Sequence, residues 1–143
     1  MKISDVIGRK AIRQVVTIQP DATVRDLLAL LAEHNIGAVV VSPDGVSLDG
    51  IVSERDVVRR LHGHDEVLDA PVRDIMTAAV HTAAPTDPLD DVRAVMTERR
   101  FRHVPIVDDG RLVGIVSIGD VVKAHIDQIE FERDQLDSYV RQT

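Results

Sequence analysis

The chain contains no cysteine, which excludes disulfide bonds, thiolate nucleophiles and cysteine-ligated zinc. It has no tryptophan, and its aromatic residues are too few to form the stacking platforms that bind single-stranded nucleic acid: Phe101, Phe131 and Tyr139. No apolar run approaches the ~18 residues of a membrane-spanning helix. The N-terminal sequence MKISDVIGRK lacks the apolar centre of a signal peptide. These absences favour a cytoplasmic protein that binds no membrane.

The overall charge is negative, because 24 acidic residues outnumber 17 basic ones and give a formal net charge of −7. Neutralisation of phosphates dominates the affinity of proteins for nucleic acids, so this chain is a poor general binder of DNA or RNA. A small anionic ligand would have to be held by local basic side chains or backbone N–H groups. The 143 residues, 44% of them hydrophobic, suffice for one domain or two small ones.

The sequence consists of two copies of one unit. Residues 50–58 read GIVSERDVV and residues 114–122 read GIVSIGDVV, and the segments 15–45 and 80–110 that precede them also align. Internal repeats of this kind determine the fold, since each copy is expected to form the same structural unit.

We place the two repeats at residues 3–64 and 72–125, and a helical extension at residues 126–143. A unit of about 60 residues buries little surface by itself, so the repeats are expected to pack together as a pseudo-twofold pair. The predicted fold class is therefore mixed α/β (α+β).

Each repeat predicts the order strand, helix, strand, strand, helix. The first strands are expected at Val15–Ile18 and Val80–Thr82. A helix follows whose apolar residues recur at helical spacing, in the first copy Val24, Leu27, Leu28 and Leu31. Thr23 is a suitable N-cap for this helix, and Pro88 suits the first turn of its counterpart.

The second half of each repeat predicts two strands and a helix. The β-branched runs Ala38–Val41 and Val104–Val107 are apolar on both faces, as buried strands are. Asp-Gly pairs at 44–45 and 109–110 predict hairpin turns. The following strands end at Val52 and Val116, and a helix then begins at the serine.

The C-terminal segment differs from the first repeat. No glycine or proline follows Gly119, which predicts a single helix to about residue 140. Its apolar residues form a heptad-like stripe that Arg133 interrupts: Val122, Ile126, Ile129, Leu136 and Val140. We favour self-association through this stripe over a helix that folds back onto the chain's own surface.

The repeated Ser-x-x-Asp motif has two interpretations. Ser53 with Asp56, and Ser117 with Asp120, are close to a capping box, in which the serine caps a helix and the acid reaches back. The same geometry also suits a nucleotide. The N–H groups of a helix start and the hydroxyl can bind phosphate, and a carboxylate matches the paired hydroxyls of a ribose.

Two β-α-β-β-α units that each end in G-h-h-S-x-x-D, with RHVPIVDDGRLVGIVSIGD in the second, resemble tandem CBS domains, also called a Bateman module. The resemblance covers residues 3–125 and is closest to standalone bacterial proteins of the family. It implies regulatory, non-catalytic binding of an adenosyl ligand in the cleft between the repeats. AMP, ADP and ATP are the expected ligands, with NAD or S-adenosylmethionine as alternatives, and no catalytic cofactor is implied.

The resemblance also implies roles for individual residues. By position in the motifs, Asp56 and Asp120 would hold ribose hydroxyls, and Ser53 and Ser117 would contact phosphate or ribose. Two segments would line the base: Ile36, Gly37, Ala38 and Val39, and Phe101, Arg102, His103, Val104 and Pro105. Four residues would close the pockets: Val16, Thr17, His81 and Thr82.

The residues around the two aspartates are not equivalent. In the family, the residue before the motif aspartate reaches phosphates held by the other copy, as Arg55 can and Gly119 cannot. Arg55, Arg102 and His103 are therefore expected to converge on Asp120. That pocket would then bind phosphates better than the Asp56 pocket.

No nucleophile, base and orienting group occur together in the sequence, which predicts no enzymatic activity. His62, His64 and Asp65 lie in the connector and are not expected to hold a metal, since metal sites need three or four converging ligands. The expected assembly is a homodimer, and an unidentified protein target remains open. The main alternative is a structural or protein-interaction module whose clefts bind nothing.

Overall fold

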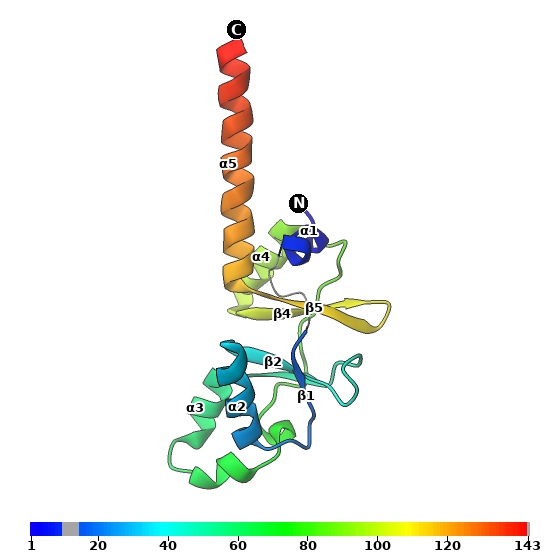
Figure 1. Ribbon diagram of the computed structural model, residues 1–143, viewed down its shortest axis with the longest axis vertical. Helices are drawn as coiled ribbons and strands as arrows, with labels where there is room; N and C mark the ends of the chain where they lie inside the picture. The colour runs from blue at the N-terminus through cyan, green and yellow to red at the C-terminus, as the bar shows by residue number, and fades with distance from the viewer. Residues whose placement is uncertain (10–14, 143) are drawn as a thin grey trace.

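The computed structural model describes residues 1–9 and 15–142, without the side chain of Arg9. Residues 10–14 of the first predicted repeat and Thr143 of the predicted extension lie outside the described residues. Figure 1 shows two α/β halves with their sheets facing each other, and one long helix that stands away from the second half. The predicted mixed fold of two repeats and a C-terminal helix is confirmed.

The first half contains a three-stranded sheet of order β1-β2-β3. β1 (Thr17–Ile18) runs parallel to β2 (Ala38–Val41), which pairs antiparallel with β3 (Gly50–Ser53). Between and after the strands lie α2 (Val24–His34) and α3 (Glu54–Leu61). Its core joins one face of α2 to the sheet: Val24, Leu27, Leu31, Val39, Val41 and Val52. Leu28, predicted on that face, is 37% exposed, because it lies at the edge of the buried stripe.

The second half has α4 (Leu89–Arg99), then β4 (His103–Asp108) antiparallel to β5 (Arg111–Ser117). The strand predicted at Val80–Thr82 is not formed; Ala83 alone makes a parallel bridge, to Ile106.

Proline explains the missing strand. In the first half, Val40 pairs with Thr17 in the parallel ladder, and Pro105 occupies the same place in the second half. Val107 N–H donates to Ala83 O at 2.9 Å. A longer ladder would need a second hydrogen bond from the backbone N–H of residue 105. Pro105 has no N–H, so this bond cannot form.

The segment that opens each repeat packs on the other half. α1 (Ile3–Arg9) places Ile3 and Val6 in the core of the second half, together with Leu89, Val104 and Val116. Two short 3-10 helices, η1 (Asp65–Asp69) and η2 (Val72–Asp74), follow the first repeat, and Val72 and Ile75 enter the first core.

Matching hydrogen bonds hold these exchanged segments. Ile3 N–H donates to Asp87 O at 2.9 Å, and Val72 N–H donates to Ala22 O at 2.8 Å. The two structural halves are therefore not the two contiguous stretches of sequence.

The exchange also accounts for the glycine that opens each repeated motif. A Cβ added at Gly50 would lie 2.7 Å from the backbone oxygen of Thr77 and 2.8 Å from the Met76 sulfur. A Cβ added at Gly114 would lie 3.0 Å from Cδ1 of Ile7. In both halves the incoming segment thus passes directly against the glycine of the outer strand.

The two strand connections differ in length. Asp109 and Gly110 have φ values of 51° and 75° and form the predicted tight turn between β4 and β5. The β2–β3 connection, residues 42–49, is a longer loop in which Gly45 has a φ of 80°. There the Asp44 carboxylate accepts backbone N–H bonds from Ser47 (2.8 Å) and Val46 (2.9 Å), which lower its pKa to about 2.

The predicted C-terminal helix is confirmed as α5 (Ile118–Gln142). Its first turns pack on α4 through the buried residues Val121 and Ala124, and the side chains from Ile129 onward are exposed. Figure 1 shows that most of its length extends beyond the two halves. No helix in the described part of the chain combines the length and apolarity needed to cross a membrane.

Candidate functional site

Both Ser-x-x-Asp motifs form closed capping boxes. Ser53 N–H donates to Asp56 Oδ2 at 2.9 Å, and Asp56 N–H donates to Ser53 Oγ at 3.3 Å. In the second repeat, Ser117 N–H donates to Asp120 Oδ2 at 2.9 Å, and Asp120 N–H donates to Ser117 Oγ at 3.1 Å. Each carboxylate is therefore held in a fixed, half-buried position at the start of a helix.

A second pair of hydrogen bonds ties each helix start to the beginning of the preceding central strand. Glu54 N–H donates to Gly37 O at 2.9 Å, and Ile118 N–H donates to Arg102 O at 2.8 Å. Ala38 pairs with Ser53, and His103 pairs with Ser117, in the antiparallel ladders. The backbone of the motif is thus the same in both repeats, and differences between the repeats lie in the side chains.

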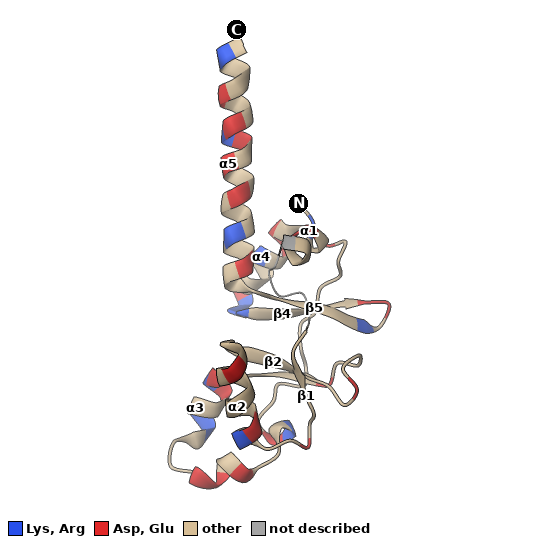
Figure 2. Cartoon of the chain, in the orientation of Figure 1, with Lys and Arg blue, Asp and Glu red and all other residues tan. Residues whose placement is uncertain are grey.

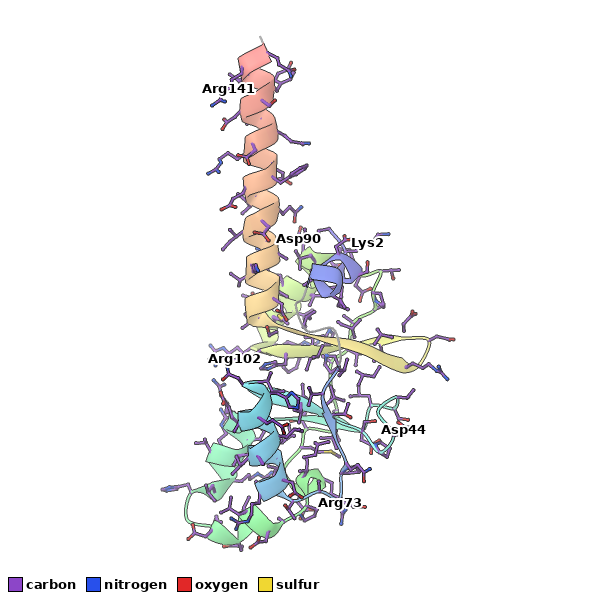
Figure 3. The ribbon with its side chains drawn as sticks, viewed as in Figure 1. Lys2, Asp44, Arg73, Asp90, Arg102 and Arg141 are labelled. Carbon is purple, nitrogen blue, oxygen red and sulfur yellow. The ribbon has the colours of Figure 1, made fainter. Side chains whose placement is uncertain are left out.

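A pocket of about 640 Å³, here called the Asp56 pocket, lies between the halves. Its volume falls within the ~300–1,000 Å³ that is usual for small-molecule sites. The first half and its incoming segment contribute Gly37, Ala38, Ile51, Ser53, Glu54, Arg55, Asp56, Val58, Arg59 and Thr77. The second half contributes Arg100, Phe101, Arg102 and His103. Figure 3 shows Arg102 at the boundary between the halves.

A smaller pocket of about 400 Å³, the Asp120 pocket, adjoins the first. It combines Ser117, Asp120 and Ile115 of the second half with residues of the first half and the shared His103: Val16, His34, Asn35, Ile36, Gly37, Ala38 and His103. Gly37, Ala38 and His103 line both pockets. Each motif aspartate therefore faces the strand start of the opposite repeat.

The two pockets differ in charge. Arg55, Arg59, Arg100 and Arg102 line the Asp56 pocket, where the acidic residues are Glu54 and Asp56. Among the described residues, the lining of the Asp120 pocket includes no lysine or arginine, and its basic side chains are His34 and His103. The Asp56 pocket therefore has the more positive lining, within a chain that is negative overall.

The predicted convergence of Arg55 and Arg102 on Asp120 is wrong, because both side chains line the Asp56 pocket. The pseudo-twofold packing sets Phe101 and Arg102 of the second repeat across from the start of α3, and neither lines the Asp120 pocket. Only His103 of the predicted trio lines the Asp120 pocket as well.

Most predicted site residues line one of the two pockets, and six line neither of them. Val39 and Val104 are buried in the two cores, and Pro105 is buried in β4, so these side chains do not line either pocket. Thr17 and Thr82 also lie outside both linings. His81 adjoins the Asp56 pocket through Phe101, on which its ring stacks with centroids 6.1 Å apart.

Several lining residues were missed by the sequence analysis: Ile51, Glu54, Val58, Arg59, Thr77 and Arg100 in the Asp56 pocket, and His34, Asn35 and Ile115 in the Asp120 pocket. Arg59 follows Arg55 by four residues on α3, and this spacing would have placed both on one helix face. Arg100 follows the last residue of α4 with a φ of 59°, for which the sequence contains no clear signal. Thr77 belongs to the exchanged segment.

No group of three His, Asp or Glu side chains suited to a metal ion occurs among the residues that the structure describes. His64 Nδ1 lies 3.2 Å from Glu66 Oε1 on an exposed part of the connector. The side chains of the two pockets that can bind a polar ligand are therefore carboxylates, hydroxyls, guanidinium groups and imidazoles.

Two pseudo-symmetric repeats with a Ser-x-x-Asp helix start on each side of a shared cleft define a tandem CBS-domain module. The sequence profile of the CBS domain matches residues 3–63 and 72–127. The chain belongs to the CBS-domain family, as the resemblance predicted.

Relatives of similar size support this assignment. The chain is 34% identical over 108 residues to the CBS domain-containing protein YhcV of Bacillus subtilis, a match that covers 76% of each chain. The CBS-domain containing protein ATU1752 of Agrobacterium tumefaciens has a similar crystal structure, with a TM-score of 0.82 and 40% identity. That match covers 87% of this chain and 99% of the other.

Two further similar structures contain adenosyl compounds. The CBS domain protein PAE2072 of Pyrobaculum aerophilum, complexed with AMP, has a TM-score of 0.74 at 29% identity over 84% of this chain and 89% of its own. The CBS domain pair of MJ0100, in complex with 5′-methylthioadenosine and S-adenosyl-L-methionine, has a TM-score of 0.77 at 25% identity over 90% and 98%. Structural neighbours of this chain thus bind adenosyl ligands.

Proposed function

We propose that the chain is a non-catalytic regulatory module that binds an adenine nucleotide in the Asp56 pocket. The observation that carries this proposal is the position of one fixed carboxylate, Asp56, in a cleft lined by four arginines from both repeats. A ribose diol and a phosphate chain require these two kinds of group side by side. The AMP complex of PAE2072 supports the class of ligand.

The capping box prepares Asp56 for this role. Its Oδ2 atom accepts the Ser53 N–H and lies 3.1 Å from Ser53 Oγ. The carboxylate therefore keeps one orientation, in which Oδ1 is the second acceptor for the ribose hydroxyls. Little side-chain entropy is lost when the ligand binds, because the carboxylate is already fixed.

The rest of the nucleotide would be held by both repeats. Arg55 on α3 and Arg102 at the start of β4 would pair with phosphate oxygens, for which the planar guanidinium group is well suited. Phe101, supported by the stacked ring of His81, and Ala38 would offer apolar surface to the base.

The Asp120 pocket is proposed to take an adenosyl ligand of lower negative charge, since its lining offers histidines in place of arginines. This order of the two pockets is the reverse of the one expected from the sequence. The thioether and sulfonium ligands in the MJ0100 complex belong to this class of compound.

Regulation would follow because residues of both repeats line each pocket. A ligand that contacts both halves stabilises the relative arrangement in which those contacts are made, and it shifts an equilibrium only if two arrangements bind it differently. The ligand would therefore report nucleotide levels through the orientation of the repeats.

Two isosteric variants test the proposal. Titration calorimetry with ATP, AMP, adenosine and S-adenosylmethionine would be carried out on the wild type, Asp56→Asn and Asp120→Asn. The amide oxygen of asparagine can still accept the serine N–H that the aspartate accepts, so both variants should remain folded. Asp56→Asn should weaken ATP binding by about tenfold or more, as expected for the loss of a hydrogen bond donated to a charged acceptor. Asp120→Asn should change ATP binding little.

Other outcomes would contradict the proposal. If none of these compounds binds or raises the melting temperature, the chain is better described as a structural or protein-interaction module, since ligand binding must stabilise the folded state. Equal losses in the two variants would disprove the order of the pockets. Turnover of ATP would disprove the non-catalytic assignment.

A further inference from the structure

The first long helix of each repeat ends at a residue with the same uncommon backbone conformation. α2 is followed by Asn35, with φ 51° and ψ 49°, and α4 is followed by Arg100, with φ 59° and ψ 33°. Both residues lie in the left-handed region, in which residues other than glycine are uncommon. Each helix has 11 residues, and the repeats align here. Asn35 and Arg100 are therefore equivalent positions of the two repeats.

Each of these residues lines the pocket that contains the aspartate of the opposite repeat. Asn35 of the first repeat lines the Asp120 pocket, and Arg100 of the second repeat lines the Asp56 pocket. After this turn, two residues lead to the start of β2 or β4, and they also line the same pockets. The left-handed turn thus places one exposed side chain at the edge of each pocket.

Arginine is an unfavourable residue for this turn. Left-handed residues that end helices are usually glycine and sometimes asparagine. Asn35 follows this preference, and Arg100 does not. Residues held in sparsely populated backbone conformations concentrate at ligand sites. Because the turn itself favours a smaller residue, the long cationic side chain of Arg100 points to a role in the pocket that it lines.

Neither side chain is engaged by the rest of the protein. Within residues 1–9 and 15–142, the Asn35 amide and the Arg100 guanidinium take part in no hydrogen bond or ion pair. Arginines elsewhere do have acidic partners, since Arg25, Arg73 and Arg93 each pair with an aspartate. Figure 2 shows basic residues where α4 passes into β4. The guanidinium of Arg100 is therefore available to a ligand.

We propose that Arg100 and Asn35 are specificity-determining residues of the two pockets. Arg100 is permanently charged, so it attracts the phosphate chain of a nucleotide in the Asp56 pocket. Asn35 offers an uncharged amide that both donates and accepts hydrogen bonds. The Asp120 pocket therefore suits an adenosyl compound whose tail has no net negative charge. This inference rests on the proposed nucleotide binding and adds to it a pair of residues that separates the two specificities.

Replacement of Arg100 by asparagine gives both repeats the same residue at this turn. Asparagine is more favourable than arginine in the left-handed conformation, so Arg100→Asn should remain folded. In titration calorimetry, Arg100→Asn should weaken ATP binding by about fivefold, as expected for the loss of an exposed ion pair. AMP binding should be weakened less and adenosine binding should not change, because the attraction grows with the charge of the ligand.

Two controls separate the charge in the pocket from other effects. Arg99→Asn removes the same charge one residue earlier, from a side chain that lines neither pocket, and should leave ATP binding almost unchanged. For Arg100→Asn, the loss of ATP affinity should become smaller as the salt concentration rises, because salt screens exposed charges. A purely structural role of Arg100 would not produce this salt dependence.

The reciprocal change tests the Asp120 pocket. Asn35→Arg would be introduced into the Asp56→Asn protein, in which ATP binding to the first pocket is weakened. The turn accepts arginine, as Arg100 shows. Asn35→Arg should strengthen ATP binding by about fivefold and weaken binding of S-adenosylmethionine, whose sulfonium group is positive. Asn35→Gln is the uncharged control and should not strengthen ATP binding.

The outcomes distinguish this inference from the proposed function. If the wild type binds ATP and Arg100→Asn binds it equally well, the inference is overturned and the proposed function stands. Equal losses for ATP and adenosine, or an equal loss in Arg99→Asn, also overturn the inference. An Asn35→Arg protein with unchanged affinity for both ligands overturns the role of Asn35. If the wild type binds none of these compounds, both proposals fail.

Discussion

The first repeat presents Gly37 and Ala38 where the second presents Arg102 and His103, although the surrounding backbone bonds are the same. Because the repeats face each other, these side chains act on the aspartate of the opposite repeat. The arginines of the second repeat thus serve the first aspartate, together with Arg55 and Arg59 from its own helix. Duplication supplied one scaffold, and a few substitutions made its two pockets electrically different.

The exchange of the segments that open the two repeats provides the strongest test of the comparison between the halves. Ile3→Ala should lower the free energy of unfolding by about 2–5 kcal/mol, the usual cost of truncating a fully buried isoleucine. Hydrogen exchange should increase first in β4 and β5, not in the first half. Val72→Ala, its counterpart, should affect β2 and β3 by a smaller amount. Faster exchange in β2 after Ile3→Ala would contradict the described packing.

Replacing the two motif glycines, Gly50 and Gly114, should lower the free energy of unfolding by different amounts. Gly50→Ala should cost about 1–3 kcal/mol, because the new methyl group would overlap a backbone oxygen that cannot turn away. Gly114→Ala should cost clearly less, since the Ile7 side chain can change its rotamer. Midpoints of denaturant unfolding would measure both, and equal values would show that the incoming segments pack alike.

Replacing the two capping serines should lower the stability of the protein by equal amounts, in contrast to the two glycines. Ser53→Ala and Ser117→Ala should each destabilise the protein by about 1 kcal/mol, because each removes the same bond to a helix-start N–H. Thermal unfolding of the two variants provides the measurement. A difference as large as the effect itself would mean that the caps are not equivalent.

The smallest expected effect concerns the longer loop of the first repeat. Its hydrogen bonds lower the pKa of Asp44 to about 2, from an ordinary value of 3.8. Ionised Asp44 therefore stabilises the fold above about pH 4, and this contribution is lost as the pH falls toward 2. Asp44→Asn should be slightly less stable than the wild type at neutral pH and equal to it near pH 2. An unchanged difference across this range would contradict the loop geometry.

Local patterns predicted much of the fold. Helical spacing located α2, the Ser-x-x-Asp motifs located two helix starts, and the absence of glycine and proline after Gly119 located α5. The missing strand at Val80–Thr82 was also readable, because Pro105 cannot donate the hydrogen bond that a longer ladder needs.

Features that depend on packing between the repeats were not predictable from the sequence. An apolar pair such as Ile3 and Val6 fits either core, so its position at the start of the first repeat did not indicate the core that it enters. The arginines were assigned to the wrong aspartate for the same reason: the assignment depends on how one repeat is rotated against the other. Both motif serines and both motif aspartates line the pockets, so the motifs identified the cleft but not the distribution of charge within it.

A crystal structure of the chain with ADP tests the central claim most directly. Our account predicts the ribose hydroxyls on the Asp56 carboxylate and the phosphates beside Arg55 and Arg102. Phosphates bound in the Asp120 pocket, or nucleotide in neither pocket at saturating concentration, would contradict it.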